Sequence, residues 1–400
     1  MRRSEGKRFV KSISKADLHM GEGISVEETF CCENRAERKI KISFIVPVYN
    51  LASGGYLQDC LESLERVRIS EMEVWVVDDG STDSSRDICD SFAARDSRFH
   101  VLHQKNAGVS AARNKGIENA TGEWLFFLDG DDLVANGIEK ALFFDSFDNA
   151  DVILFTYTQI NGNEEIIRRS KNIPSKRLIN ISSDTCACLP ELIIENSSGD
   201  DPALVGVNLR CVFHLYRRSF IKKNNIRFHE GIVRTEDMLF NLQVAFSRPW
   251  YIRSSETISL YRVLRTGSAT DRYLSEVDRN SNEVIALTEK MIKQYGHEKD
   301  LQCALYSLYV NAFLSCVIFD YCHPDNPKSY GTRKNEFSNL RSEKRYDEAL
   351  KNVKISAFKK IGSRSQISII LCRINAFFLL SFYLKAVRFA RDLTEKKTRG

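Results

Sequence analysis

The sequence lacks several features that mark particular classes of protein. No uninterrupted apolar run in its 400 residues approaches the roughly 20 residues of a bilayer-spanning helix, so we expect no membrane span. The basic residues 1–8 have no apolar segment behind them, which argues against a secretory signal. The eleven cysteines are scattered, and the close pairs Cys31–Cys32 and Cys186–Cys188 lack the spacing of zinc ligands. We therefore expect reduced, mostly buried thiols in a cytoplasmic protein.

Excess basic charge is absent from most of the chain and concentrated at its C-terminal end. Residues 351–400 contain 12 Lys and Arg and 2 Asp and Glu, a net charge of +10, whereas the first 350 residues carry 46 basic and 51 acidic groups. A mildly acidic body does not suit a nucleic-acid-binding core, so we expect no nucleic-acid partner. The basic tail instead favours contact with an anionic surface.

Composition divides the chain into four parts: a polar extension, an α/β domain with two halves, a helical region and a basic amphipathic tail. The extension has no sustained hydrophobic periodicity, so we expect it to be poorly ordered. The parts are residues 1–39, residues 40–275 with halves at 40–135 and 136–275, residues 276–345, and residues 346–400.

Four short apolar segments alternate with amphipathic segments between residues 41 and 132. The apolar segments are rich in β-branched and aromatic residues, which predicts strands, and the amphipathic segments predict helices. This alternation implies a doubly wound α/β sheet of parallel strands with helices on both faces. Because Pro47 has no amide hydrogen, we expect the first strand to end there or to lie at an edge. The predicted strands are Ile42–Val46, 73–78, 98–103 and Trp124–Leu128.

Polar side chains follow three of these four strands, whose carboxyl ends share one edge of the sheet. They are Tyr49, Asp79, and the pair Asp129 and Asp131. Neighbouring carboxylates repel one another unless a cation or solvent offsets their charge, and hard divalent ions prefer such oxygen ligands. Asp129 and Asp131 are therefore candidate metal ligands, with a solvated acidic turn as the alternative. Tyr49 is either a stacking surface for a base or sugar ring or an ordinary core tyrosine.

Further residues near this edge are candidate ligand contacts. The carboxylate of Asp79 can accept a hydrogen bond from a base or from a ribose hydroxyl. Arg113 suits either a phosphate or a neighbouring carboxylate. Asn106 and Gly108 suit the tight turn that begins the third helix, and we count Asn106 and Arg113 among the candidate ligand-binding residues.

The second half of the domain contains one further carboxylate pair, Glu236 and Asp237. Thr235 precedes the pair as a predicted N-cap, and the helix dipole favours carboxylates in a first turn. The pair is therefore either an ordinary helix start or part of a site. Farther along, Arg262 or Arg265 is a candidate contact for a diphosphate.

Four motifs occur in order within residues 41–135: IVPVYN, VVDDGSTD, NAGVSAARN and FFLDGDD. Together they resemble the nucleotide-binding half of family 2 glycosyltransferases. The resemblance implies the A-type glycosyltransferase fold, a Rossmann-like doubly wound mixed sheet, followed here by a helical C-terminal region. The family commonly has Asp-Ser-Asp-Asp where this chain has Asp129-Gly-Asp-Asp132. Glycine keeps the carboxylates, so we expect metal binding to be retained.

The resemblance also implies a role for each motif residue in binding a nucleotide-sugar donor. Pro47 and Tyr49 line the base pocket, and Asp79 meets the base. Asp129 meets the ribose region, and Asp131 binds Mg²⁺ or Mn²⁺.

The stretch Val212–Phe240 is similar to the acceptor-side segment of the family, which ends in a Glu-Asp pair at a helix start. The resemblance implies that Asp237 is the general base and that Glu236 orients it or contacts the acceptor. It further implies a single in-line displacement with inversion, in which the metal offsets charge on the diphosphate leaving group. In processive polysaccharide synthases of the family, a Gln-x-x-Arg-Trp motif after this pair holds the growing chain. This chain lacks the motif and an expected membrane span, so the resemblance implies transfer of one sugar per encounter.

The expected function is transfer of a sugar from a nucleoside-diphosphate sugar, first of all a UDP-sugar, to a glycan or lipid-linked acceptor in surface polysaccharide biosynthesis. Two alternatives stay open: a non-catalytic glycosyltransferase-like partner subunit, and a sugar-phosphate nucleotidyltransferase. Enzymes of the latter kind carry an arginine in a glycine-rich loop after the first strand, and the segment Asn50–Gly55 has none.

The tail contains two apolar segments, Ile367–Cys372 and Ile374–Leu384, separated by Arg373. They are too short and too interrupted to span a bilayer. A basic helix that carries Phe377, Phe378, Phe382 and Tyr383 suits a membrane interface. We therefore expect peripheral contact through residues 366–392 at the inner face of the cell membrane, with a helix packed on the body as the alternative.

Overall fold

The structure is a computed structural model, and it describes residues 41–69, 71–136, 138–139, 149–169, 176–180, 211–263, 273–295, 302–355 and 363–399. The predicted N-terminal extension and the close cysteine pairs lie outside these residues. The described cysteines are free and buried, as expected: Cys60, Cys89, Cys211, Cys316, Cys322 and Cys372.

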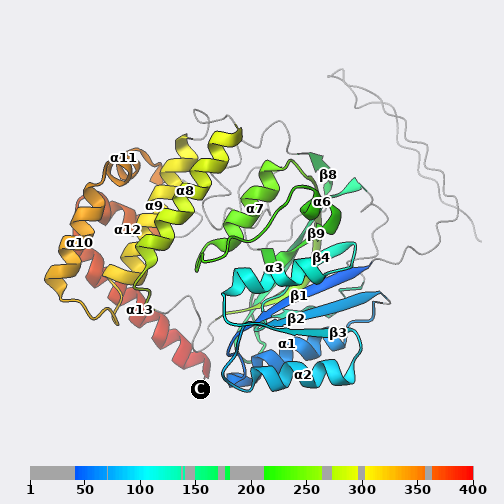
Figure 1. The fold of residues 1–400 in the computed structure, drawn as a ribbon. Coiled ribbons are helices and arrows are strands. Elements are labelled where there is room, and N and C mark those ends of the chain that lie inside the picture. Colours follow the sequence, from blue (N-terminus) through cyan, green and yellow to red (C-terminus); the bar gives the residue numbers. More distant parts are fainter. Residues whose placement is uncertain are drawn as a thin grey trace, which may run out of the picture. The chain divides into compact units, whose positions relative to one another are not determined.

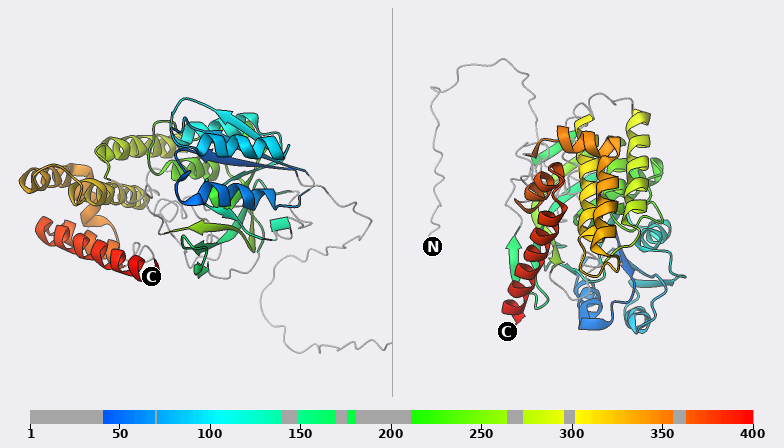
Figure 2. Two further views of the ribbon diagram at one scale, coloured as in Figure 1. Left: turned by 90° about the horizontal axis from the view of Figure 1, so that it is seen from below. Right: turned by 90° about the vertical axis from the view of Figure 1, so that its left-hand side faces the viewer.

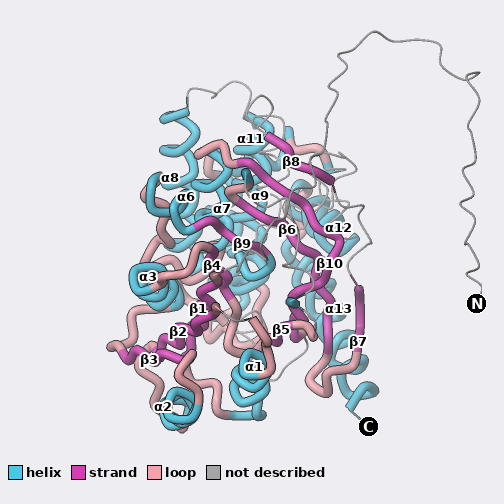
Figure 3. The backbone as a smooth tube through the Cα atoms, turned by 90° about the vertical axis from the view of Figure 1, so that its right-hand side faces the viewer, coloured by secondary structure: helices cyan, strands magenta, loops and turns pink. Residues whose placement is uncertain are grey.

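The described strands form one ten-stranded mixed sheet in the order β3-β2-β1-β4-β9-β6-β10-β5, with β7 paired to β6 and β8 paired to β10 (Figure 3). Neighbours from β3 to β4 are parallel, whereas β9 runs antiparallel to both β4 and β6. The strands are β1 Ile42–Val48, β2 Met72–Asp78, β3 Phe99–His103, β4 Trp124–Phe127, β5 Leu133–Val134, β6 Val152–Ile160, β7 Ile166–Arg169, β8 Lys176–Asn180, β9 His214–Arg217 and β10 Trp250–Arg262.

The first half has the predicted order of strands and helices, and its helices cover both faces of the sheet (Figure 1). Alternate residues of β1 belong to two separate apolar clusters: Phe44 packs with residues of α1 and α2, and Ile45 with residues of α3. A Cβ atom at Gly116 of α3 would lie 2.3 Å from Ile45 Cγ2, so glycine allows this helix to approach the strand closely. These helices are α1 Tyr56–Glu65, α2 Ser85–Arg95 and α3 Val109–Asn119.

The prediction for Pro47 was wrong, because Pro47 lies within the central strand β1 and pairs in register with Val77 of β2. The missing amide hydrogen of Pro47 is tolerated because it would point to the β4 side of the strand. The carbonyl of Ile45, two residues earlier, accepts from Leu128 N on the β4 side at 3.0 Å. Pairing between β1 and β4 ends at Ile45 and Phe127, so Pro47 faces a position where the ladder has already ended.

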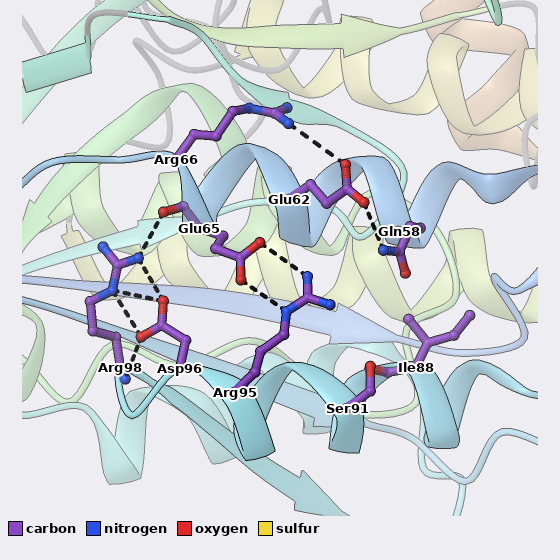
Figure 4. Close-up of polar contacts among 9 residues, drawn as sticks. All are labelled: Gln58, Glu62, Glu65, Arg66, Ile88, Ser91, Arg95, Asp96 and Arg98. Carbon is purple, nitrogen blue, oxygen red and sulfur yellow. Dashed lines mark hydrogen bonds and ion pairs between the residues drawn. The ribbon is translucent and has the colours of Figure 1, made fainter.

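A surface network joins α1, α2 and the start of β3 (Figure 4). The Arg95 guanidinium donates to both oxygens of Glu65, at 2.9 and 3.0 Å. Arg98 donates to the carbonyl of Glu65 and to the carboxylate of Asp96. An exposed pair such as Arg95–Glu65 contributes about 0–1 kcal/mol, whereas the Arg98–Asp96 pair is partly buried.

The second half of the sheet carries α6 Arg218–Lys223 and α7 Glu236–Phe246, with the short 3₁₀ turn η3 Cys211–Phe213 just before β9. Because β9 is antiparallel to β4 and pairs Leu215 with Phe126, residues 211–213 extend past the carboxyl end of β4. The fold therefore brings the start of the second half to the same edge as the motifs of the first half.

The C-terminal region is helical, as predicted, and its helices lie together in both views of Figure 2. One apolar cluster includes Phe240 of α7, Phe313 of α9 and Leu380 of α13, so the core continues from the sheet into this region. The elements are α8 Val277–Tyr295, α9 Gln302–Cys316, the π-helical turn η5 Val317–Tyr321, α10 Tyr330–Ser342, α11 Lys344–Asn352, α12 Ser363–Arg373 and α13 Phe377–Arg399.

One apolar stretch in the C-terminal region bears on the expectation that the chain has no membrane span. Residues Ala304–Tyr321 in α9 and η5 have a mean hydropathy of 1.3 over 18 residues, long and apolar enough to cross a membrane by length and composition. More than half of this stretch is buried inside the protein, and Phe313 and Val317 are fully buried in the core. A core helix of a globular domain meets the same criterion.

Candidate active site

The loops after β1 and β2 are held together by the polar side chains of their own motifs. Asn50 N donates to Ser81 Oγ at 3.0 Å, and Thr82 N donates to Asn50 Oδ1 at 2.8 Å. Tyr49 stands on the loop at this edge with 46% of its surface exposed, so it is not a core tyrosine. Pro47 is buried in the strand beneath it.

Asp79 is buried at this edge and organises the loop between β3 and α3. Its carboxylate accepts hydrogen bonds from Gln104 Nε2, Ala107 N and Gly108 N, each at 2.8 Å. Gly80 adopts a positive φ of 73°, and a Cβ there would lie 2.8 Å from Asn106 N, so the loop that contains Asn106 rests directly against this glycine. The observed partners of Asp79 are thus groups of the protein, and Asn106 lies exposed beside them.

Asp129, Asp131 and Asp132 form an acidic cluster between β4 and β5. Each offers an oxygen atom, and these three atoms lie within 4.8 Å of one another. The sequence analysis did not count Asp132 among the candidate ligands; its side chain is buried, and its Oδ1 accepts from Arg262 N at 2.7 Å. A Cβ at Gly130 would lie 2.8 Å from Leu51 Cδ1, so glycine lets this turn pack against the loop after β1.

Arg113 of α3 is the residue that joins the two halves of the site. Its guanidinium is buried, with Nη2 donating to Asp129 Oδ1 at 2.8 Å. Nη1 donates to Glu236 Oε1 at 3.1 Å and to Asp237 Oδ1 at 2.9 Å. Of the two predicted partners for Arg113, phosphate or carboxylate, the structure places it on carboxylates. Guanidinium stays charged in proteins, so Arg113 offsets the negative charge of all three neighbours.

The neighbouring residue of the same motif makes a second connection between the halves. Asn114 Nδ2 donates to the carbonyl of Phe228 at 2.9 Å, and Phe228 N donates back to Asn114 Oδ1 at 2.9 Å. The guanidinium of Arg113 also lies 5.1 Å from the centre of the Phe228 ring. Adjacent motif positions therefore hold the segment that leads into α7.

Asp237 has a second partner that the sequence did not indicate. Cys211 Sγ, from η3, donates to Asp237 Oδ1 at 3.1 Å. Burial raises the pKa of the Cys211 thiol well above its usual value, so the sulfur keeps its proton and acts as the donor. Among the described residues, both side-chain hydrogen bonds to the Asp237 carboxylate reach Oδ1 and not Oδ2.

The start of α7 differs from the predicted capping. Thr235 occupies the N-cap position, but its side chain makes no capping hydrogen bond among the described residues, and its hydroxyl donates to the carbonyl of Arg234. Its φ of 66° lies in the left-handed region, which is unfavourable for a β-branched residue. Such strain costs about 1–3 kcal/mol and is concentrated at functional sites.

Glu236 lies in an environment that disfavours its charged form. Burial, reinforced by the negative charge of Asp237, raises the pKa of Glu236 to about 7. A substantial share of Glu236 is therefore protonated at neutral pH, which reduces repulsion between the two carboxyl groups. The protonated form can donate a hydrogen bond to an incoming group.

The prediction for Arg262 was wrong. Its side chain has no solvent exposure, and it stabilises the acidic turn by donating from Nε to the carbonyl of Asp131 at 3.0 Å. Nη1 and Nη2 contact the carbonyl of Gly162 and the carboxylate of Asp59. The alternative, Arg265, lies outside the described residues.

Comparisons with known proteins give the family of the chain. A profile described as "Glycosyl transferase family 2" matches residues 43–223. The chain is 31% identical over 276 residues to the uncharacterized glycosyltransferase YibD of Escherichia coli, covering 64% of this chain and 72% of YibD. It is 25% identical over 349 residues to the uncharacterized glycosyltransferase EpsJ of Bacillus subtilis, covering 86% of this chain and 95% of EpsJ.

A solved structure shares the fold. The crystal structure of S. aureus TarS 1–349 in complex with UDP-GlcNAc matches with a TM-score of 0.50 and 17% sequence identity, covering 88% of this chain and 92% of that chain. The expected A-type fold is thereby confirmed.

Proposed function

Because the chain belongs to glycosyl transferase family 2 and has the A-type fold, we propose that this glycosyltransferase moves one sugar from a nucleoside-diphosphate sugar to a hydroxyl group of an acceptor, with inversion at the anomeric carbon. One observation carries the proposal. Arg113 connects the acidic cluster of the donor half, through Asp129, with the Glu236–Asp237 pair of the acceptor half. Donor and acceptor chemistry would therefore meet at a single edge of the sheet.

The donor would bind at the loops after β1 and β2. Exposed Tyr49 offers a ring for stacking on the base, beside Pro47 and the loop that Asp79 holds in place. TarS carries UDP-GlcNAc in its crystal structure, so UDP-sugars are the first donors to test.

The acidic cluster fits a divalent ion. Three carboxylate oxygens within 4.8 Å of one another form a hard, anionic donor set of the kind that Mg²⁺ or Mn²⁺ prefers. Asp129, Asp131 and Asp132 would hold the ion, which supplies positive charge to offset the diphosphate leaving group. Arg262 and Arg113 already hold two of these aspartates in place, so the ligands are preorganised.

The chemistry at the acceptor side would belong to Asp237. Its Oδ2 takes the proton of the acceptor hydroxyl as that oxygen forms a bond to the anomeric carbon and the bond to the diphosphate oxygen breaks. Arg113 and Cys211 fix Oδ1 and so orient the carboxylate. One direct displacement from the opposite side inverts the configuration. Glu236, partly protonated at neutral pH, would donate a hydrogen bond to the acceptor.

The proposed acceptor is a glycan or a lipid-linked glycan of surface polysaccharide biosynthesis, and the proposed location is the cytoplasm at the inner face of the cell membrane. A lipid-linked acceptor would explain why the chain combines a mildly acidic body with a strongly basic C-terminal tail.

The first test measures release of UDP and GDP from a panel of nucleotide sugars with Mn²⁺, for the wild type, Asp131→Ala and Asp237→Asn. Turnover of one donor that Asp131→Ala abolishes supports the donor site and the role of the metal. With an acceptor, Asp237→Asn should lose transfer while retaining donor binding. Absence of binding and turnover with every donor and metal would favour a non-catalytic subunit, and pyrophosphate as product would favour a nucleotidyltransferase.

A further inference from the structure

Helices α12 and α13 present two different faces. The inner face is part of the core and includes Ile369, Cys372, Phe377, Leu380 and Leu384. Two of the membrane contacts expected from the sequence do not lie fully on the outer face, since Phe377 is buried and Tyr383 is only partly exposed. The expected alternative, packing on the body, is thus true of one face only.

Arginine side chains fix the orientation of this helix pair. Arg341 of α10 donates to the carbonyls of Cys372 and Arg373 at the end of α12, each at 2.8 Å. Arg388 of α13 donates to the carbonyls of Cys322 and Ile318, at 2.9 and 2.6 Å. The outer face is therefore held outward by the fold.

The outer face carries a stripe of exposed apolar side chains. On α13, Phe378, Phe382 and Phe389 are 68%, 68% and 66% exposed, and their spacing of four and seven residues places them on one side of the helix. Leu379 beside them is 52% exposed, and Ile374 between the helices is 64% exposed. Monomeric soluble proteins rarely expose large contiguous apolar patches, so this stripe indicates an interaction surface for another molecule or a membrane.

We propose that the outer face of α12 and α13 docks on an anionic lipid surface. Residues 363–399 carry 8 Lys and Arg and 2 Asp and Glu, so this helix pair has a net positive charge. Arg373 and Arg388 bind backbone carbonyls of the body, whereas exposed Lys385 lies between Phe382 and Phe389. Aromatic rings at the level of the headgroups and basic side chains against anionic phosphates are the two contributions that hold an interfacial helix.

A second copy of the chain suits this face less well. A two-fold symmetric dimer places the same patch on both partners, so two surfaces with a net positive charge would face each other. Lipid phosphates reverse the sign of that interaction. The docking proposal goes beyond sugar transfer and does not rest on it. Its test measures binding to vesicles and has no activity readout.

The experiment is co-sedimentation of the full chain with phosphatidylcholine vesicles and with mixed phosphatidylcholine and phosphatidylglycerol vesicles. We expect binding to the anionic vesicles only, weakened by salt, and reduced about tenfold or more in the double variant Phe378→Asp with Phe382→Asp. The matched control is Ile166→Asp with Ile167→Asp on β7, which introduces the same two negative charges at exposed apolar residues elsewhere and should bind like the wild type.

The docking proposal fails if the wild type does not bind anionic vesicles, or if the Phe378 and Phe382 double variant binds them as tightly as the wild type does. Mass photometry, run in parallel, tests whether a second copy of the chain binds to this face instead. A dimer that only this variant dissociates, without lipid binding by the wild type, would assign the face to self-association. Circular dichroism melting of each variant verifies that the exposed substitutions leave the fold intact.

Discussion

Arg113 Nη1 lies 2.9 Å from Asp237 Oδ1, an ion pair between residues 124 positions apart in the chain. Through Nη2 the same guanidinium holds Asp129 at 2.8 Å. A change at the acidic cluster can therefore reach the proposed base through one side chain, and loss of Arg113 leaves three carboxylates without their shared cation.

We predict that Arg113→Met destabilises the protein by about 3–5 kcal/mol, because removing one partner of a buried ion pair leaves uncompensated charge. Denaturant unfolding of variant and wild type measures the difference. Arg95→Met is the matched control, since its pair with Glu65 is exposed and should contribute no more than about 1 kcal/mol. Equal effects of the two substitutions would contradict the assigned role of Arg113.

We predict that Cys211→Ala lowers kcat about ten- to hundredfold, since a hydrogen bond to a charged carboxylate is lost. Cys211→Ser keeps a donor at the same position and should retain most of the activity. The KM for the donor should stay constant in both variants, because Cys211 contacts Asp237 and lies on the acceptor side. Once an acceptor is identified, steady-state kinetics measures kcat and KM. An equal loss of kcat in Cys211→Ala and Cys211→Ser would indicate an effect of packing alone.

We predict that Asp132→Asn raises the concentration of Mn²⁺ needed for half-maximal turnover, as Asp131→Asn does. Both substitutions replace a charged oxygen ligand of the cluster with a neutral one. Glu118→Gln, at an exposed acidic residue of α3 outside the cluster, serves as control. Titration of turnover with Mn²⁺ measures the effect, and an Asp132→Asn curve that coincides with the wild type would exclude Asp132 as a ligand.

We predict that Glu236→Gln stabilises the protein, and more so at pH 8 than at pH 5. The pKa of Glu236 is about 7 in the folded protein and 4.5 as a free side chain, so the folded state binds the proton more tightly. The free energy of unfolding of the wild type therefore falls as pH rises from about 4.5 to 7, and the neutral amide removes this loss.

Glu73→Gln is the contrasting control for that experiment. Burial acts to raise the pKa of Glu73, but hydrogen bonds from Ser43 and Thr121 outweigh it and lower the pKa. The Glu73 carboxylate thus stabilises the fold above its unfolded pKa, and Glu73→Gln should cost more stability as pH rises. A stability difference for Glu236→Gln that is the same at both pH values would refute the assigned environment of Glu236.

The two halves of the domain differed in how far sequence alone could predict them. The strands and helices of residues 41–132 follow from apolar spacing, and their order predicted which side chains share an edge. Pro47 and Thr235 were interpreted from local rules, and in both cases the tertiary environment overrode the local preference. Arg262 was one of two candidate contacts for a diphosphate, yet it is buried in the protein, because burial of a charged residue depends on partners distant in the chain.

The sequence by itself determined the alternation of strands and helices, the motifs at the strand ends and the family to which they belong, because these are local patterns of a few residues. Only the tertiary structure decided that Cys211 and Arg113 share Asp237 Oδ1 and that Asp132 joins the acidic cluster. The Cys211 contact depends on β9 entering the sheet antiparallel to β4, which sets residues 211–213 beside the end of that strand. Strand order of this kind is settled by packing of the whole core, and no short stretch of sequence encodes it.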